Sequence, residues 1–312
     1  MPNWAEVLEE INQARQNDPA GQDVVRRKYL SQLAAYTGRT TIAYYSGWLQ
    51  RRVVGSDIND EDKNGFMLCA HEVQKDAGLD IILHTPGGGI AATESIIHYL
   101  KTLFGSDIRA IIPQISMSAG TIIACACKSI VLGKQSNLGP TDPQIQGIPA
   151  FATKREFQRA YQEILDDQRA SAVWGHILRQ LHPTFLQQCD YAIGWTRSFV
   201  RQCLKDNMFS GDPDAAKQVN RIVRKLMDLD TNKGHSKHLH FQECIDVGLN
   251  VEMMEDDPDL QDLILTTHHC YMHTLANTNA FKIIENHLGR AFIKQQGRQQ
   301  SALTIGLGGP PS

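Results

Sequence analysis

The sequence predicts an α/β protein with a parallel sheet, followed by a mainly helical C-terminal part. Between residues 41 and 132, short β-branched and apolar segments alternate with helical segments, which is the pattern of strand–helix–strand units. After Pro149 the apolar residues recur at helical spacing through several long segments. The chain has 312 residues, of which 42% are hydrophobic, so it can bury a large core.

The strands and helices of the core follow one another in a regular order. Residues 41–46 are β-branched and aromatic and end at Gly47, which predicts a first strand. Gly78 separates the next helix from a second strand over 79–84, and residues 90–104 have apolar positions at helical spacing. The core elements expected are strands over 41–46, 79–84, 108–113 and 129–132, and helices over 61–76, 90–104 and 118–128.

The later part of the chain is predicted to be helical, with one strand near its end. No internal repeat or linker divides the sequence, so we expect a single domain with a helical N-terminal arm over 1–38, an α/β core over 39–150, a helical elaboration over 151–294 and a flexible tail over 295–312. Helices are expected over 154–167, 172–181, 185–204, 215–229 and 258–274, a short acidic helix follows residue 240, and a final strand covers 291–294.

Composition and charge exclude several classes of protein. The net charge is −3, with acidic and basic residues mixed along the chain, so no nucleic acid or anionic membrane surface is expected as a partner. The seven cysteines include no C-x-x-C pair, and the N-terminus lacks a signal-peptide pattern, which together indicate a cytoplasmic protein without disulfides. Residues 110–127 are uncharged, but Pro113 and several polar residues favour a buried core segment over an integral membrane segment.

A glycine-rich turn joins the second strand to the following helix. It reads Thr85-Pro86-Gly87-Gly88-Gly89, and such a turn exposes backbone N–H groups beside a helix N-terminus, where an anion is stabilised. The same residues would also serve as an ordinary tight turn. They match neither G-x-G-x-x-G nor a P-loop, because no Gly-Lys-Ser/Thr follows. No ATP site and no cofactor are therefore predicted.

A second strand-to-helix turn carries Ser118. A serine at the first turn of a buried helix lies where the helix dipole favours developing negative charge. The N–H of Ala119, together with the N–H of Gly88 from the glycine-rich turn, could bracket one oxyanion. The alternative is that Ser118 is an ordinary N-cap, whose hydroxyl bonds the first turn of its own helix.

Several short segments share their order with one known family. They are YYSGW over 44–48, HTPGGG over 84–89, ISMSAGT over 115–121, NLGPTDP over 137–143, HH over 268–269 and NTNAF over 277–281. Together they resemble the serine dehydrogenase proteinase family of Clp/crotonase-fold serine peptidases, which is related to signal peptide peptidase A. The resemblance covers most of the chain.

The resemblance implies a spiral of parallel strands and helices that hydrolyses polypeptides. It implies Ser118 as the nucleophile, with the oxyanion held by the main-chain N–H groups of Gly88 and Ala119, and it also implies a homo-oligomer. The residues that would support the two turns are Pro86, Gly87, Gly89 and Gly120.

Two serines lie in the motif, and the family pattern distinguishes them. In the family a glycine follows the nucleophile by two residues. Only Ser118 has that relation, to Gly120, whereas Ser116 lies upstream at the end of a strand. Ser118 is therefore the expected nucleophile.

The general base is not fixed by the motifs. The Clp protease has a histidine downstream of its serine, but this chain reads Gly-Pro-Thr-Asp-Pro over 139–143, without a histidine. Signal peptide peptidases use a lysine, and Lys154, at the start of a helix after a loop, is the candidate here. It could act as a base only if burial or a neighbouring cation lowered its pKa well below about 10.4; otherwise it is a solvated lysine. His235 is the second candidate.

Two further clusters are interpreted as structural. His268, His269 and His273 lie on one predicted helix, but the glutamate of H-E-x-x-H and a C-x-x-C pair are both missing, so no metal is expected. The basic loop over 233–240 is too short for nucleic-acid binding and lacks interleaved aromatic residues. It is expected to be solvated or to cover the active site.

The sequence thus predicts a serine endopeptidase that does not itself use ATP, with a Ser118–Lys154 dyad favoured over a Ser-His-Asp triad. Its expected partners are a polypeptide substrate and further copies of itself. Two alternatives stay open. A crotonase-type hydratase or isomerase acting on acyl thioesters would use carboxylates in place of the serine, and Asp142 is the only acid close to the motifs. A catalytically inactive scaffold would keep the fold alone.

Overall fold

One seven-stranded sheet organises the molecule. The computed structural model describes residues 4–145, 147–228 and 234–297. The strand order is β10-β5-β3-β2-β1-β11-β12, in which the first five strands are parallel and β11 and β12 are antiparallel to their neighbours. The strands are β1 (Thr40–Ser46), β2 (Leu79–His84), β3 (Ile108–Ile112), β5 (Ser129–Leu132), β10 (Val251–Met253), β11 (Ala280–Asn286) and β12 (Ala291–Gln295).

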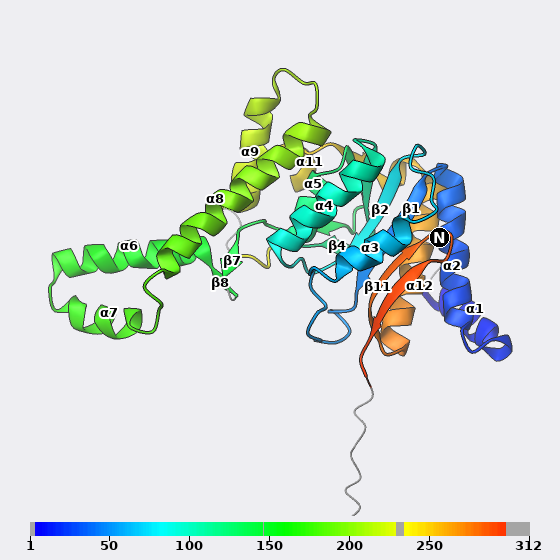
Figure 1. The fold of residues 1–312 in the computed structure, drawn as a ribbon, viewed down its shortest axis with the longest axis horizontal. Coiled ribbons are helices and arrows are strands. Elements are labelled where there is room, and N and C mark those ends of the chain that lie inside the picture. The colour runs from blue at the N-terminus through cyan, green and yellow to red at the C-terminus, as the bar shows by residue number, and fades with distance from the viewer. Residues whose placement is uncertain (1–3, 146, 229–233, 298–312) are drawn as a thin grey trace, which may run out of the picture.

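Helices cover both faces of this sheet (Figure 1). On one face lie α3 (Asp62–Ala70), α4 (Ile90–Phe104) and α5 (Ala119–Cys125), and on the other lie α2 (Gly21–Thr37) and α12 (Pro258–Asn277), with α1 (Trp4–Asn17) packed outside them. Alternate residues of β1 pack into the hydrophobic cores on the two faces of the sheet. Ile42 and Tyr44 face the α4 side, and Ala43 and Tyr45 face the α12 side.

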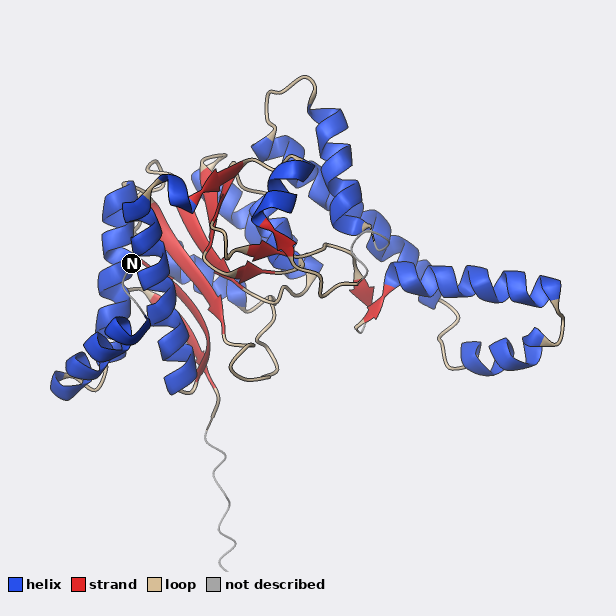
Figure 2. Ribbon diagram, turned by 180° about the vertical axis from the view of Figure 1, so that it is seen from behind, coloured by secondary structure: helices blue, strands red, loops and turns tan. Residues whose placement is uncertain are grey.

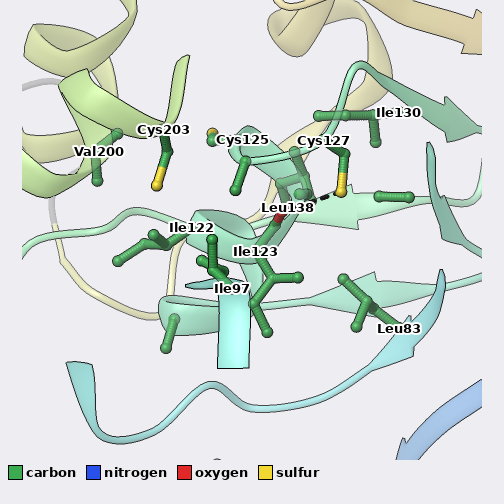
Figure 3. Packing of buried hydrophobic residues seen from close by; sticks show 14 of the residues in the cluster. Leu83, Ile97, Ile122, Ile123, Cys125, Cys127, Ile130, Leu138, Val200 and Cys203 are labelled. Carbon is green, nitrogen blue, oxygen red and sulfur yellow. Dashed lines mark hydrogen bonds between the residues drawn. The ribbon is translucent and has the colours of Figure 1, made fainter. Parts of the chain in front are cut away.

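The short helix α5 is buried on all sides. Each of its seven residues is buried, and Ile122, Ile123 and Cys125 lie in the core between α4 and α8 (Figure 3). The Cys127 thiol donates to the Ile123 carbonyl at 3.2 Å, and all seven cysteines of the chain are buried free thiols. This packing fixes the N-terminus of α5, where Ser118 lies.

A pair of helices extends away from the sheet. Figures 1 and 2 show α6 (Ala150–Asp166) and α7 (Ala170–Leu178) projecting as an arm that α8 (Phe185–Cys203) leads back to the core. The remaining helices are the π-helical turn η1 (Leu204–Met208), α9 (Ala215–Met227), α11 (Phe241–Val247) and the 3₁₀ turn η2 (Met254–Asp256). No helix of the described residues is long and apolar enough to cross a membrane.

The chain after the arm is less helical than the sequence predicts. It returns to the core and adds β10 and β11 to the sheet, neither of which the sequence pattern revealed. All seven residues of β11 are buried, including charged ones. Buried Lys282 contacts Asp62 at 2.7 Å, and buried Glu285 contacts Arg26 at 2.6 Å. Because both faces of β11 are buried and its charged residues are paired inside the protein, its sequence lacks the alternation of apolar and polar residues that marks a strand with one face in water.

A second, smaller sheet lies beside the first. Its order is β4-β6-β9, from β4 (Ile115–Ser116), β6 (Asn137–Leu138) and β9 (Leu239–His240). A separate hairpin pairs β7 (Gln144–Ile145) with β8 (Ile148–Pro149). The three strands of this small sheet come from segments far apart in the sequence, and β4 ends two residues before Ser118.

The predicted elements of the core agree closely with the structure. Strands over 79–84 and 129–132 and the helix over 90–104 have the observed bounds, and the expected helix over 61–76 is shortened to α3. The uncharged stretch 110–127 forms β3, β4 and α5 inside the core. The expected flexible tail lies largely outside the described residues, from 298 onward, as does the start of the basic loop at 233.

Candidate active site

Ser118 adopts an unusual backbone conformation at the N-terminus of α5. Its φ of 51° and ψ of −114° lie outside the regions that ordinary residues favour, and such strain is typical of functional turns. The hydroxyl makes no capping hydrogen bond, so Ser118 does not behave as an ordinary N-cap. The turn is held by the N–H of Gly120, which donates to the Met117 carbonyl at 2.8 Å.

The glycine-rich turn packs directly against this serine. Gly87 has a φ of +94°, and a Cβ added there would lie 2.7 Å from the Ser118 Cβ and 2.9 Å from the Ala119 nitrogen. Only glycine fits so close an approach. Among the described residues, the N–H groups of Gly88 and Ala119 donate to no protein acceptor. Two free donors therefore lie beside the serine, as an oxyanion site requires.

The two serines of the motif differ in accessibility. Ser116 is fully buried in β4, and its hydroxyl has no partner among the described residues. Ser118 is partly exposed and lines a cavity of about 640 Å³. Only Ser118 can meet a substrate from solvent.

His235 and Asp142 form a hydrogen-bonded pair in the same cavity. The distance between His235 Nδ1 and Asp142 Oδ1 is 2.9 Å, and both residues line the cavity together with Ser118. The Asp142 side chain is only 1% exposed, whereas that of His235 is 25% exposed. A buried carboxylate that accepts from Nδ1–H leaves Nε2 available as a proton acceptor.

The small sheet explains why these three residues meet. β6 and β9 are antiparallel with Leu138 opposite Leu239. Asp142 lies four residues after Leu138, and His235 lies four residues before Leu239. Continuing the same antiparallel register therefore places Asp142 opposite His235. β4 runs parallel to β6 and leads two residues later to Ser118. Ser118, Asp142 and His235 thus each lie a few residues from a different strand of the small sheet.

Lys154 lies elsewhere. Its ammonium group contacts the Asp190 carboxylate at 2.5 Å, and both side chains are substantially exposed, at 39% and 56%. It lines a separate groove with Phe157 and Tyr161 of α6, and it is absent from the cavity around Ser118. The structure therefore brings together Ser118, Gly88, Ala119 and the reserve candidate His235, but not Lys154.

The sequence pattern assigns Asp142 no role in a peptidase, because a lone aspartate in a loop has no partner visible in the sequence. The missing signal is the pairing of β6 with β9, which are 100 residues apart and only two residues long each. No periodicity can be read from strands of that length.

The histidines of α12 lie on the opposite face of the sheet from Ser118. Buried His268 contacts the Tyr45 hydroxyl at 3.2 Å, and His273 contacts the Trp4 carbonyl at 3.0 Å. Burial, with a smaller contribution from the neighbouring His269, lowers the pKa of His268 to about 3. Burial likewise holds the pKa of His84 well below its ordinary value. No set of three or more His, Cys, Asp or Glu side chains in the described part of the chain is arranged to hold a metal ion.

The chain is similar to two uncharacterized proteins of one archaeon. The chain is 28% identical over 195 residues to one uncharacterized protein of Methanocaldococcus jannaschii, a match that covers 62% of this chain and 60% of that protein. A second uncharacterized protein of that organism is 34% identical over 110 residues, covering 35% of this chain and 37% of that protein. The chain spans less than two thirds of the length of either relative. No solved structure matches it significantly.

The family model of ClpP-like SDH-type serine proteinases matches residues 55–255. The matched part contains the glycine-rich turn, Ser118, Asp142 and His235, together with the strands that place them. The central, mostly parallel sheet also agrees with a ClpP-like fold. The chain belongs to the family of ClpP-like SDH-type serine proteinases.

Proposed function

We propose that this protein is a serine endopeptidase that hydrolyses polypeptides through an acyl-enzyme on Ser118, with His235 as the general base and Asp142 as the residue that orients it. The hydrogen bond between buried Asp142 and His235, in the same cavity as the strained Ser118, carries the proposal. The family membership supports serine peptidase chemistry.

The reaction follows the arrangement of donors and acceptors. Nε2 of His235 takes the hydroxyl proton as Ser118 Oγ attacks the substrate carbonyl, and the N–H groups of Gly88 and Ala119 stabilise the oxyanion. The imidazolium then gives its proton to the leaving amine, and the scissile C–N bond breaks. Water attacks the acyl-enzyme with the same histidine as base, which releases the new carboxyl terminus and restores the serine.

The buried carboxylate has two effects on this base. It fixes the tautomer that presents a lone pair at Nε2, and it stabilises the imidazolium that forms during the reaction. Asp142 Oδ2 accepts no hydrogen bond from the described residues, so His235 is its hydrogen-bonding partner among them. Lys154 lacks such a setting, because its ammonium group lies in another groove and already pairs with Asp190.

Labelling with a fluorophosphonate probe tests the proposal. The purified wild-type chain is expected to gain one adduct by intact mass, and Ser118→Ala none. His235→Gln should slow labelling by about 10²–10⁴-fold, which is the usual contribution of a general base. His238→Gln is a matched control, because His238 is exposed in the same loop and does not line the cavity. It should label at the wild-type rate.

Two results would overturn the proposal. A wild-type chain that stays unlabelled and cleaves no unfolded protein substrate would instead fit an inactive scaffold. Equal labelling of His235→Gln and wild type would remove His235 as the base. The cytoplasmic location and the homo-oligomer expected from the sequence are likewise proposals, and size-exclusion chromatography with light scattering tests the second.

A further inference from the structure

A second cavity lies across α8 from Ser118. Its volume is about 630 Å³, within the range of small-molecule sites. α6, α8 and α9 form its walls. Tyr191 and Trp195 of α8 face the Ser118 cavity, whereas Arg197 and Arg201 of the same helix face the second one. No described residue lines both cavities, so the second cavity is separate from the one around Ser118.

The walls of this cavity are strongly basic. Among the residues that the structure describes, four arginines line it, against one lining carboxylate, that of Asp228. Arg201 Nε donates to the neutral Oδ1 of Asn220 at 3.1 Å. Arg197 and Arg224 have no hydrogen bond or ion pair with any described residue. Guanidinium groups stay charged at physiological pH, so their gathering in one concavity favours an anionic ligand. The four arginines are Arg155, Arg197, Arg201 and Arg224.

The neighbouring cavity on α9 shows that this excess is local. Its described lining holds three basic residues and three acidic ones, so these charges balance. The basic residues are Arg221, Arg224 and Lys225, and the acidic ones are Asp228, Glu243 and Asp246. Arg224 and Asp228 line both cavities, but the excess of described basic residues is found only in the α6–α8–α9 cavity.

One part of the same cavity is apolar. Phe151 of α6 lines it together with Val223 and Met227 of α9, which are 3% and 4% exposed and belong to the hydrophobic core. An aromatic ring beside a fixed aliphatic surface suits the planar ring of a ligand. The cavity thus combines a place for a ring with guanidinium groups that can bind phosphate oxygens in pairs.

We propose that this cavity binds a nucleoside phosphate, with the base against Phe151, Val223 and Met227 and the phosphates on Arg197, Arg201 and Arg224. An acidic peptide would meet the basic groups but would leave the apolar part without a matching ring. The absence of a P-loop is no obstacle, because the proposed contacts come from side chains of three helices and not from a glycine-rich loop.

Isothermal titration calorimetry on the full chain tests this site with ADP, and with pyrophosphate and adenosine as its two halves. ADP is expected to bind more tightly than either half, and its affinity should fall as salt is raised. The double variant Arg197→Gln/Arg201→Gln should weaken ADP binding by about tenfold or more, since charge-assisted contacts are lost. Both arginines are at least partly exposed, so the variant should fold, and circular dichroism verifies this.

Arg159→Gln provides the matched control. Arg159 is an exposed residue of α6 that pairs with Glu163 at 2.8 Å and does not line the cavity, so ADP should bind this variant as it binds wild type. The proposal fails if the Kd for ADP is weaker than about 1 mM. It also fails if the double variant binds ADP with wild-type affinity. Binding of an oligoglutamate peptide in preference to ADP would also overturn it, in favour of an acidic polypeptide.

Discussion

The cavity around Ser118 and the groove around Lys154 both place a basic side chain against a carboxylate, but in opposite surroundings. Asp142 is 1% exposed and accepts a hydrogen bond from an imidazole in the cavity of Ser118, whereas Asp190 is 56% exposed and pairs with an ammonium group at the surface. A buried carboxylate acts on its partner with little screening, while an exposed ion pair contributes little to stability. The comparison teaches that a basic residue near a motif becomes a base only through its surroundings.

Exchanging the two carboxylates for amides should separate the two sites most strongly. Asp142→Asn should slow Ser118 labelling by about 10²–10⁴-fold, because an amide neither holds the required tautomer nor stabilises the imidazolium. Asp190→Asn should leave the rate within about twofold of wild type, since it alters only a surface pair. The check is the pseudo-first-order rate of Ser118 labelling in each variant. Similar reductions in both would contradict the distinction drawn between the two sites.

The backbone of the Ser118 cavity should also be far less tolerant than that of the arm. In Gly87→Ala the new methyl group would lie 2.7 Å from the Met117 carbonyl and Ser118 Cβ, at a φ of +94°. We expect a loss of about 1–3 kcal/mol in the free energy of unfolding and at least about a tenfold loss of labelling.

Gly175→Ala is the matched substitution. Gly175 lies in α7 of the arm, where an added Cβ meets nothing within 4 Å. Alanine favours helix over glycine, so the variant should be as stable as wild type or more stable by up to about 1 kcal/mol. Urea denaturation measures both variants, and equal stabilities would contradict the packing described for Gly87.

Acid should destabilise the protein through the buried histidines on the α12 side of the sheet. Burial lowers the pKa of His268 to about 3 and that of His84 well below its ordinary value, so both are neutral in the folded chain. In the unfolded chain such histidines bind protons below about pH 6.5. The free energy of unfolding should therefore fall with falling pH, for His268 in the window from about 6.5 down to about 3, and His84 should add a loss in the same direction.

Urea denaturation between pH 6.5 and 5 checks this dependence on the His268 face. His268→Gln keeps a polar group beside the Tyr45 hydroxyl but removes the titrating group, so it should flatten the slope. His98→Gln alters an exposed histidine of α4 and should leave the slope as it is. If His268→Gln titrates with the wild-type slope, the acid sensitivity arises elsewhere in the chain.

The smallest effect is expected for Lys154→Gln. Labelling should stay within about twofold of wild type, and the free energy of unfolding should change by less than about 1 kcal/mol, since the exposed pair with Asp190 is all that is lost. A labelling rate that falls as far as in His235→Gln would restore the lysine as the base.

Most of the core could be predicted because its signals are local. The bounds of β2, α4 and β5 follow from short apolar runs and helical periodicity, and both turns of the site are visible as glycine and serine segments. β11 was missed because its polar residues are satisfied by partners such as Asp62 and Arg26, more than 200 residues away in the chain. A strand that is buried on both faces and contains paired charges does not show the alternation of apolar and polar residues by which strands are predicted.

The sequence by itself determined the parallel α/β core, because the strands and helices follow from local patterns. It also predicted Ser118 and the N–H groups of Gly88 and Ala119 as site residues, from two short motifs and the family resemblance. Only the tertiary structure decided that His235, and not Lys154, lines the same cavity as Ser118, and which basic residues line the second cavity. The register between β6 and β9 brings Asp142 to His235, and three helices bring four scattered arginines together. Both arrangements depend on distances between segments far apart in the chain, which packing sets and local pattern does not encode.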